Sequence, residues 1–440
     1  SLNEVVGTHP ITQGTLASAL GYQISYTGAN YVITARPLTV TYTGVNKGYD
    51  ANTTATVNTT DNRIAGDLFT INRTATFFPD ANAANNKTVN VTAVSLSTGD
   101  AANYSVAATG STTANITAKP VNLSGTRVYD GTVNFTAGAF TVTAITGTLG
   151  VDALTIASGA GTVPSANVAA NQTLTSVNLA LGATVGLASN YTLVGGTHTG
   201  TITTRPVNLS GTRVYDATVN FSAAILTITG TVLGQTLTLS GGPGTVPSAN
   251  VATNQTLTVT ALALVSGTGL ASNYTLVGGT HTGTITAGAI VVNLAGTRVY
   301  DGTLNFTAGA FTATITGTVG GETLTIASGT GTVPGANVAV NQTLTVGTLA
   351  LGNGTGLASN YTLVGGTHTG TITARPLTIT GYTGGNKVYD GLLPTTTVTS
   401  TGDNRVAADA ATLTLTPVAA FLDPNVGSGK VVQVTAVTLG

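Results

Sequence analysis

The chain has 440 residues and a formal net charge of -1, and only 7% of its residues are Asp, Glu, Lys or Arg, against about 25% in typical globular domains. It contains no Cys, which excludes disulfides and thiolate chemistry, and it has no basic cluster, which argues against nucleic acid as a partner. No apolar run of about 18 residues occurs, so we expect no helix to insert into a membrane.

Residues 1–35 come first and are expected to be the end of a preceding domain, because the repeated pattern starts after them. Every later repeat except one opens with a basic residue and Pro, at Arg36, Lys119, Arg205 and Arg375. The segment LASNYTLVGGTHTGTIT occurs three times without a change, at Leu187–Thr203, Leu270–Thr286 and Leu357–Thr373. Such self-similarity at a fixed period indicates a repeat architecture.

These markers divide the chain into the repeats 36–118, 119–204, 205–287 and 288–374 and the incomplete repeat 375–440. The first and last repeats (type A) share the motif D-N-R-[IV]-A-x-D, at Asp61–Asp67 and Asp403–Asp409. The three middle repeats (type B) share T-V-P-[SG]-A-N-V and N-Q-T-L-T instead, which suggests local duplication of type B. Because both ends interrupt the pattern, we expect the natural polypeptide to be longer.

Within each repeat the residue pattern is typical of strands. Segments such as 153–157 alternate apolar and polar residues, and Thr and Val, which favour the pleated surface, are abundant. Dipeptides such as Asp130-Gly131 and Gly195-Gly196 favour turns. The Pro at each boundary favours an extended backbone, so one repeat should run directly into the next. We therefore expect an all-β chain, a tandem array of small β-sandwich or β-grasp-like domains forming an elongated rod.

A Tyr-Asp pair recurs in every repeat and is the most regular candidate motif. Its members are Tyr49, Asp50, Tyr129, Asp130, Tyr215, Asp216, Tyr300, Asp301, Tyr389 and Asp390. We expect a structural role, in which the tyrosine ring is buried with its hydroxyl at the edge of the core. The aspartate should accept backbone N–H groups in a turn that the following glycine permits.

Catalytic and cofactor sites are not expected, so we interpret the chain as a protein without enzymatic activity. A single histidine recurs in each type B repeat, at His198, His281 and His368, which is too few ligands for a metal site. In the first repeat a calcium site made by Asp61, Asp67 and Asp80 is conceivable. The alternative is a solvated loop whose carboxylates are balanced by Arg63 and Lys87.

The start [RK]-V-Y-D-G, the segment A-S-N-Y-T-L and the ending T-G-T-I-T-x-R-P resemble the YDG-type repeats of large bacterial surface exoproteins. Residues 1–35, with G-T-H-P-I-T-Q-G-T-L, resemble the end of an MBG-type domain, which accompanies such repeats in filamentous-haemagglutinin-like adhesins. The sequence departs from the motif at Ala51 and Ala217, which replace the glycine, and at Gly288-Ala289, which replaces Arg-Pro.

The resemblance implies an extracellular protein, at the bacterial surface or secreted, that acts as the structural stalk of an adhesin and spaces a binding tip from the cell. The low charge leaves open an alternative, a subunit that associates laterally with its own copies into a filament, sheath or biofilm matrix. In both cases the expected partners are neighbouring domains of the same chain, and the motifs do not indicate a host ligand.

Overall fold

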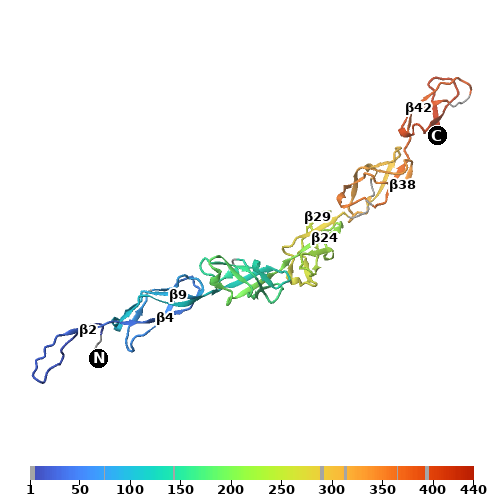
Figure 1. Ribbon diagram of the computed structural model, residues 1–440. Helices are drawn as coiled ribbons and strands as arrows, with labels where there is room; N and C mark the ends of the chain where they lie inside the picture. Colours follow the sequence, from blue (N-terminus) through green and yellow to red (C-terminus); the bar gives the residue numbers. More distant parts are fainter. Residues whose placement is uncertain are drawn as a thin grey trace. The chain divides into compact units, whose positions relative to one another are not determined.

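A computed structural model describes residues 5–73, 75–141, 144–287, 292–311, 315–363, 365–391 and 396–440 (Figure 1). Over these residues β-strands dominate, and the helices are short 3-10 turns such as η1 (Gly99–Asn103) and η2 (Ala137–Ala139). No helix in this part of the chain is long and apolar enough to cross a membrane. The prediction of an all-β tandem array is therefore confirmed.

The chain forms two compact units. The first consists of residues 1–206, 231–236 and 266–275, and the second of residues 207–230, 237–265 and 276–440. The division passes through the third repeat, so two loops of that repeat pack with the first unit. Contacts between consecutive repeats described below each lie within one of these units.

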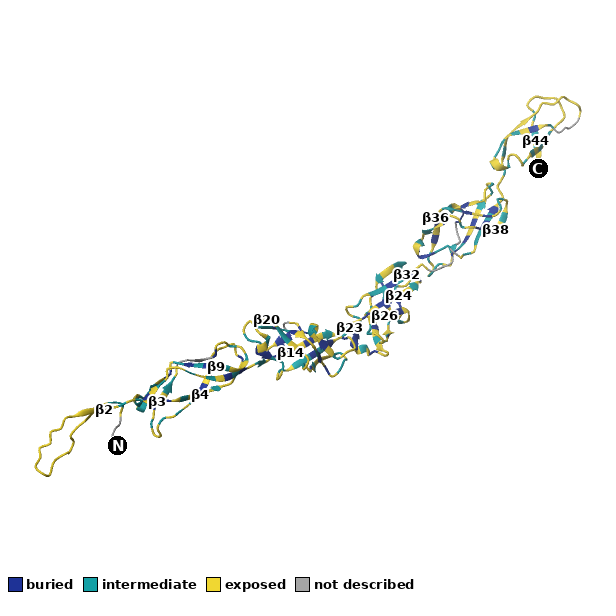
Figure 2. Cartoon of the chain, in the orientation of Figure 1, coloured by how far each residue is buried: buried dark blue, intermediate teal, exposed yellow. Residues whose placement is uncertain are grey.

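The N-terminal residues form a hairpin of β1 (Gly7–Ile11) and β2 (Ala29–Ile33), which is mostly exposed (Figure 2). The first repeat follows it with β3 (Arg36–Leu38), β4 (Val40–Val45), β5 (Lys47–Gly48), β6 (Thr56–Asp61), β7 (Thr70–Asn72), β8 (Ala75–Phe77), β9 (Ala84–Thr92), β10 (Ser95–Ser97), β11 (Tyr104–Val106) and β12 (Gly110–Thr117). Its main sheet has the order β5-β12-β9-β8.

The second repeat shows the type B arrangement. Its strands are β13 (Lys119–Pro120), β14 (Asn122–Val128), β15 (Asn134–Thr136), β16 (Ile145–Thr146), β17 (Ala153–Ser158), β18 (Ala160–Thr162), β19 (Ala169–Thr173), β20 (Ala180–Val185), β21 (Tyr191–Thr192) and β22 (His198–Thr203). The main sheet has the order β16-β14-β22-β19, and the first long strand, β14, pairs in parallel with the last, β22. The repeat therefore closes by pairing its beginning with its end.

The third and fourth repeats have the same topology, with main sheets β26-β24-β32-β29 and β35-β33-β40-β38. The third contains β23 (Arg205–Pro206), β24 (Asn208–Val214), β25 (Asn220–Phe221), β26 (Leu226–Thr229), β27 (Leu237–Gly241), β28 (Gly244–Thr245), β29 (Ala252–Thr256), β30 (Leu262–Ser266), β31 (Tyr274–Thr275) and β32 (His281–Thr286). The fourth contains β33 (Asn293–Val299), β34 (Asn305–Thr307), β35 (Ile315–Thr316), β36 (Leu324–Ser328), β37 (Thr330–Thr332), β38 (Ala339–Thr343), β39 (Ala350–Asn353) and β40 (His368–Thr373).

The fifth repeat contains two hairpins within the described residues. One pairs β41 (Ile379–Gly384) with β42 (Val398–Asp403), and the other pairs β43 (Leu415–Phe421) with β44 (Val432–Leu439). Short 3-10 turns precede tyrosines or core strands in the later repeats, at η4 (Ala188–Asn190), η5 (Ala223–Ile225), η6 (Ala271–Asn273), η7 (Ala308–Ala310), η8 (Ala358–Asn360) and η9 (Ala407–Asp409).

A phenylalanine on the strand that follows the first long strand of each type B repeat fills the core. Phe135 has no exposed surface, and it packs over Gly125 of β14 and Gly200 of β22, which lie opposite each other in the sheet. A Cβ at Gly200 would lie 2.8 Å from the ring of Phe135. The two glycines therefore leave the space that the ring needs, which explains why glycine recurs at both positions in the type B repeats.

Candidate functional site: the junctions between repeats

The aspartate of each Tyr-Asp pair closes a turn after the first long strand. Asp130 Oδ1 accepts the N–H of Thr132 at 2.8 Å and pairs with Nη1 of Arg127 at 2.6 Å. Burial opposes ionisation of Asp130, but the bonds from Thr132 and the charge of Arg127 outweigh it, so the pKa of this carboxyl lies below its ordinary value. The turn holds the tyrosine before it in a fixed position.

The residue after each Tyr-Asp pair has a left-handed backbone. Gly131 has φ 80°, and the two alanines that depart from the motif, Ala51 and Ala217, have φ 59° and φ 61°. Alanine therefore adopts the same turn, at a steric cost that glycine does not have. The third departure, Gly288-Ala289, lies outside the described residues.

Ala217→Gly is expected to raise the free energy of unfolding by about 0.5–1 kcal/mol, because it relieves the left-handed strain but adds freedom to the unfolded chain. Urea denaturation measures the change. The matched reverse variant, Gly131→Ala, should lower stability, since its Cβ would lie 3.1 Å from Val232 Cγ1. A loss of stability in Ala217→Gly would contradict this account of the turn.

A second tyrosine, in the Asn-Tyr segment near the end of each repeat, anchors a tight turn of the same repeat. The hydroxyl of Tyr191 accepts the N–H of Leu149 at 3.0 Å and donates to Asp152 Oδ2 at 2.7 Å. The other repeats build the same arrangement with different acceptors, as in the pairs Tyr104 with Asp67, Tyr274 with Gln235 and Tyr361 with Glu322. We call this tyrosine and its acceptor the receptor of the repeat.

The tyrosine of the Tyr-Asp pair inserts into the receptor of the following repeat. Tyr49 donates its hydroxyl to Asp152 at 3.2 Å, and its ring stands edge-on to Tyr191 with centroids 5.3 Å apart. The ring pairs Tyr129–Tyr274 and Tyr215–Tyr361 repeat this geometry at 5.4 and 5.6 Å. The carboxylate of Asp152 thus accepts hydrogen bonds from two tyrosines that belong to consecutive repeats.

The asparagine before the receptor tyrosine forms a second link to the preceding repeat. Asn190 is only 2% exposed; its Oδ1 accepts the N–H of Ala83 at 2.9 Å, and its Nδ2 donates to Asn82 at 3.1 Å. Asn273 and Asn360 make the equivalent pairs of bonds. Because a buried amide without partners is costly, each link requires the two repeats to be docked.

The YDG domain family matches the chain over residues 34–114, 112–201, 198–285, 282–370 and 373–440. The chain belongs to the YDG domain family. Five tandem YDG domains indicate a structural repeat protein. The comparison with curated proteins gave no match.

The structure places the tyrosines of the YDG motif at the junctions. Tyr49, Tyr129 and Tyr215 are 8%, 4% and 4% exposed, and Tyr300 is half-buried and donates to Asp409 at 2.8 Å. Tyr389 differs, since it is 62% exposed. Sequence reasoning assigned each ring to the core of its own repeat and missed the acceptors, because the position holds Asp, Gln or Glu in turns of different sequence.

Burial and a carboxylate acceptor raise the pKa of the tyrosines at the junctions that contain Asp152 or Glu322. Burial, with the hydrogen bond to Asp152, raises the pKa of Tyr191 to about 12, and burial with Glu322 raises the pKa of Tyr215 to about 12. Both values exceed the ordinary 10 of tyrosine. A phenolate beside a carboxylate would be repelled, so the junctions at Asp152 and Glu322 require protonated tyrosines.

These pKa shifts predict alkaline weakening of the YDG junctions. A group with a raised folded-state pKa stabilises the fold fully below its unfolded value, and this contribution disappears as the pH rises through the folded value. The free energy of unfolding should therefore decline as the pH rises from about 10 to about 12. Urea titrations over this range, with tyrosinate absorbance recorded in parallel, measure it; constant stability after the tyrosines have ionised would contradict the assignment.

The three candidate calcium ligands of the first YDG repeat have separate partners. Asp61 binds the guanidinium of Arg63 at 2.7 and 2.8 Å, Asp67 accepts the hydroxyl of Tyr104, and Asp80 pairs with Lys87. In the described part of the chain no three His, Cys, Asp or Glu side chains are placed to hold a metal. The structure therefore does not bring the three carboxylates together, and Asp67 belongs to a receptor.

We expect the type B repeats to fold without calcium. Thermal melts of residues 119–374, recorded with and without EDTA, should coincide, because this segment has no cluster of carboxylates that a calcium ion could bridge. A large fall in the melting temperature on chelation would contradict the prediction.

The recurrent histidines hold a loop of their own repeat. Nε2 of His198 lies 2.7 Å from the carbonyl oxygen of Leu193, and Nε2 of His281 lies 2.7 Å from that of Leu276. Nδ1 of His281 also accepts the N–H of Leu209 at 3.2 Å. The ring of His281 thus connects the loop before the last strand of its repeat to the first long strand.

Proposed function

We propose that this chain is the structural stalk of a large extracellular bacterial adhesin and spaces a binding tip from the cell surface. The observation that carries the proposal is the junction in which Tyr49 and Tyr191, from consecutive repeats, share Asp152. A recurrent polar contact of this kind resists rotation of one repeat against the next. Such resistance serves a spacer and has no evident use in an enzyme.

The short connections between repeats support the same proposal. Strand β12 ends at Thr117, and β13 begins at Lys119 and pairs in parallel with Tyr191–Thr192 of its own repeat. Arg205–Pro206 pairs in the same way with Tyr274–Thr275. The basic residue and Pro therefore belong to a strand, and no flexible linker separates these repeats.

Small-angle scattering tests the stalk proposal. Five stacked repeats of about 30–40 Å each would give a rod on the order of 150–200 Å long, since strands rise about 3.3 Å per residue. A compact globule of this length would instead have a radius of gyration near 22 Å. A value close to that of the globule would refute the proposal.

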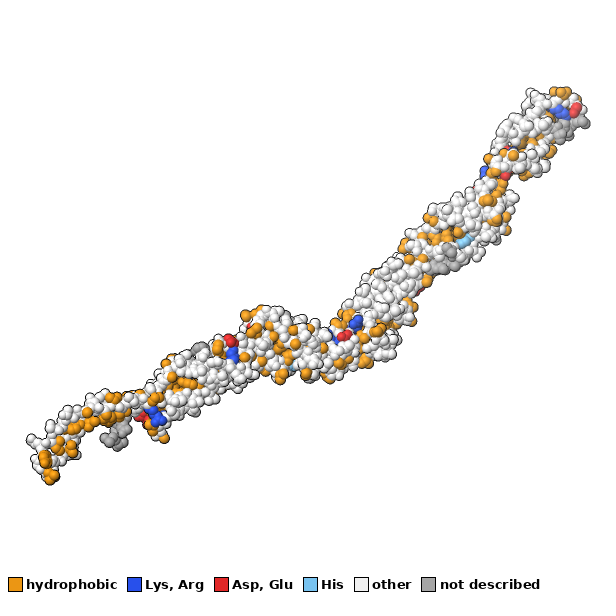
Figure 3. All heavy atoms as spheres, in the orientation of Figure 1, with side chains coloured by type: hydrophobic (Ala, Val, Ile, Leu, Met, Phe, Trp, Pro, Cys, Tyr) orange, Lys and Arg blue, Asp and Glu red, His pale blue; other side chains and the backbone are white. Residues whose placement is uncertain are grey.

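Lateral association into a filament or matrix remains the second candidate. The sparse charges favour it, since small groups of Lys, Arg, Asp and Glu side chains are separated by wide uncharged areas (Figure 3). The edge strands favour the stalk, because β19, β29 and β38 each carry an irregularity in register next to an asparagine with positive φ, at Asn171, Asn254 and Asn341. Such bulges oppose edge-to-edge pairing. Light scattering distinguishes monomers from laterally associated chains.

A further inference from the structure

Two tyrosines from consecutive repeats lie against each other at three of the junctions. They are the Asp152 pair (Tyr49 and Tyr191), the Gln235 pair (Tyr129 and Tyr274) and the Glu322 pair (Tyr215 and Tyr361), each named after the residue that accepts its hydroxyls. The ring centroids in the three pairs are 5.3, 5.4 and 5.6 Å apart, and the ring planes cross at 79°, 78° and 73°. All six side chains are buried, so packing holds each ring close to its partner.

The shared acceptor also brings the reactive carbons of the two rings towards each other. Tyr49 and Tyr191 both donate to Oδ2 of Asp152, at 3.2 and 2.7 Å, and Glu322 accepts the two hydroxyls of its pair with its two carboxylate oxygens. The ortho carbons of a phenol flank its hydroxyl, and they are the positions at which phenoxyl radicals couple. The rings of dityrosine are twisted about the bond that joins them, so crossed rings are closer to this product than stacked rings would be.

We propose that the Asp152 pair and the Glu322 pair are sites of oxidative modification, at which a one-electron oxidant links consecutive repeats through dityrosine. Each tyrosine gives one electron to the oxidant and its phenolic proton to the carboxylate, which passes the proton to water. The two radicals then form a bond between their ortho carbons, and the hydrogen on each of these carbons moves to the oxygen of the same ring. Both phenols are restored, and the product has two hydrogen atoms fewer than the original pair.

The carboxylate distinguishes these two pairs from the Gln235 pair. Burial and the hydrogen bond to Asp152 raise the pKa of Tyr191 to about 12, so this tyrosine is protonated at neutral pH and must release a proton when it is oxidised. Asp152 and Glu322 can receive that proton, because each accepts the hydroxyl directly and is only half-buried, within reach of water. The amide of Gln235 accepts a hydrogen bond but does not act as a base.

Dityrosine would supply a covalent connection that other side chains cannot make in this region. Residues 120–374 contain neither Cys nor Lys, so neither a disulfide nor an isopeptide bond from lysine can join the repeats there. The new bond would form where consecutive repeats dock, and it would prevent them from separating. The modification goes beyond the stalk proposal and is measured on linked peptides, whereas the stalk is measured by its dimensions, so either one can fail while the other holds.

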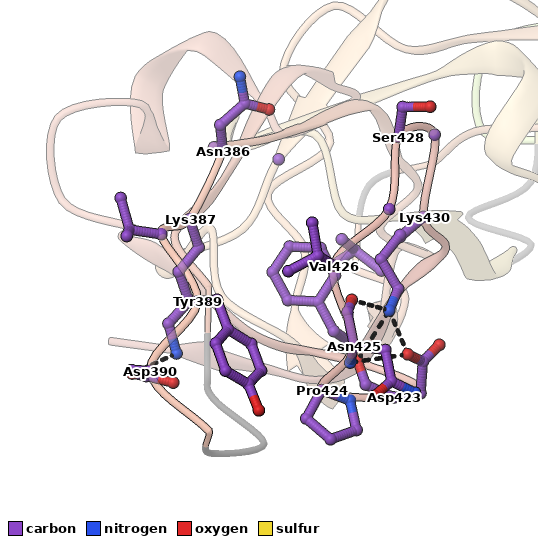
Figure 4. Close-up of a pocket in the computed structure, with 17 residues that line it drawn as sticks. Asn386, Lys387, Tyr389, Asp390, Asp423, Pro424, Asn425, Val426, Ser428 and Lys430 are labelled. Atoms are coloured by element: carbon purple, nitrogen blue, oxygen red, sulfur yellow. Dashed lines mark hydrogen bonds and ion pairs between the residues drawn. The ribbon is translucent and has the colours of Figure 1, made fainter.

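Oxidation of residues 1–440 in dilute solution by tris(bipyridine)ruthenium(II) and persulfate under light tests the proposal. Each persulfate ion takes up two electrons and becomes two sulfate ions, as one cross-link requires. After proteolysis, tandem mass spectrometry should find the Asp152 and Glu322 pairs linked at about ten times the yield of the Gln235 pair or more, because a positioned base accelerates proton transfer. Tyr389, which is 62% exposed and lines an open pocket of about 540 Å³ (Figure 4), reports that the oxidant has reached the chain.

Two substitutions exchange the acceptors, and both keep a side chain that accepts a tyrosine hydroxyl. Asp152→Asn should lower the yield of the linked Asp152 pair about tenfold and leave the Glu322 pair of the same chain unchanged, as an internal control. Gln235→Glu should raise the yield of the Gln235 pair to about that of the Glu322 pair. In concentrated urea, where the repeats no longer dock, the linked pairs should be lost while Tyr389 still reacts. Carboxylate pairs that stay unlinked after Tyr389 is oxidised, yields that do not respond to the exchange, or links that persist in urea would overturn the proposal.

Discussion

Tyr129→Ala is expected to lower the free energy of unfolding of the second repeat by about 3–5 kcal/mol, as other truncations of buried aromatic side chains do. The ring is 4% exposed and stands 5.4 Å from Tyr274, so its removal leaves a cavity in the junction. The hydroxyl also accepts Nε2 of Gln235 at 2.8 Å, and this bond would be lost. Urea denaturation followed by tyrosine fluorescence measures the effect.

Two variants separate the contribution of the hydroxyl group from that of the buried ring. Tyr129→Phe keeps the ring and removes only the hydroxyl, so it should cost about 0.5–1.5 kcal/mol. Tyr389→Ala removes the same side chain where it is 62% exposed, and it should change stability by less than about 0.5 kcal/mol. If Tyr129→Ala were as mild as Tyr389→Ala, the buried junction would not exist in solution.

Asn273→Ala should uncouple the second and third repeats. Asn273 is 1% exposed, its Oδ1 accepts the N–H of Val168 at 2.9 Å, and its Nδ2 donates to Asn167 at 2.9 Å. Alanine leaves the Val168 N–H without this acceptor, at a cost of about 1–3 kcal/mol. Scanning calorimetry should show one transition resolving into two, and the Val168 amide should exchange faster with solvent.

The matched control is Asn134→Ala, because Asn134 is an exposed asparagine on strand β15 of the second repeat. It should leave both the calorimetric profile and the exchange of Val168 unchanged. Unaltered protection of Val168 in Asn273→Ala would show that the asparagine link does not hold the repeats together.

The strands could be predicted from the sequence because their signal is local. Alternation of apolar and polar residues, as in 153–157, together with Asp-Gly turns, identifies strands without knowledge of their partners. The boundaries proposed for the five repeats stay predictions. The junctions could not be found in this way, because Tyr49 and its acceptor Asp152 are 103 positions apart.

The acceptor position illustrates a second limit. Asp67 was grouped with Asp61 and Asp80 because the three carboxylates are close in sequence, whereas its partner, Tyr104, is 37 positions away. Aspartate, glutamine and glutamate occupy the same place in different repeats, since each can accept a tyrosine hydroxyl. This position requires only a side chain that accepts a hydrogen bond, so it is not occupied by one residue type. A sequence motif therefore does not reveal it.

Each complete repeat carries both halves of the junction, a Tyr-Asp turn on its first long strand and a receptor near its end. In the second repeat these are Tyr129 and Tyr191, and each engages a different neighbour. Any type B repeat can therefore follow any other without a compensating change. Unequal recombination between gene segments that encode the identical stretches at Leu187–Thr203 and Leu270–Thr286 would add or delete a whole module in frame. A change in the number of repeats would in this way alter the length of the array and leave every interface between repeats intact.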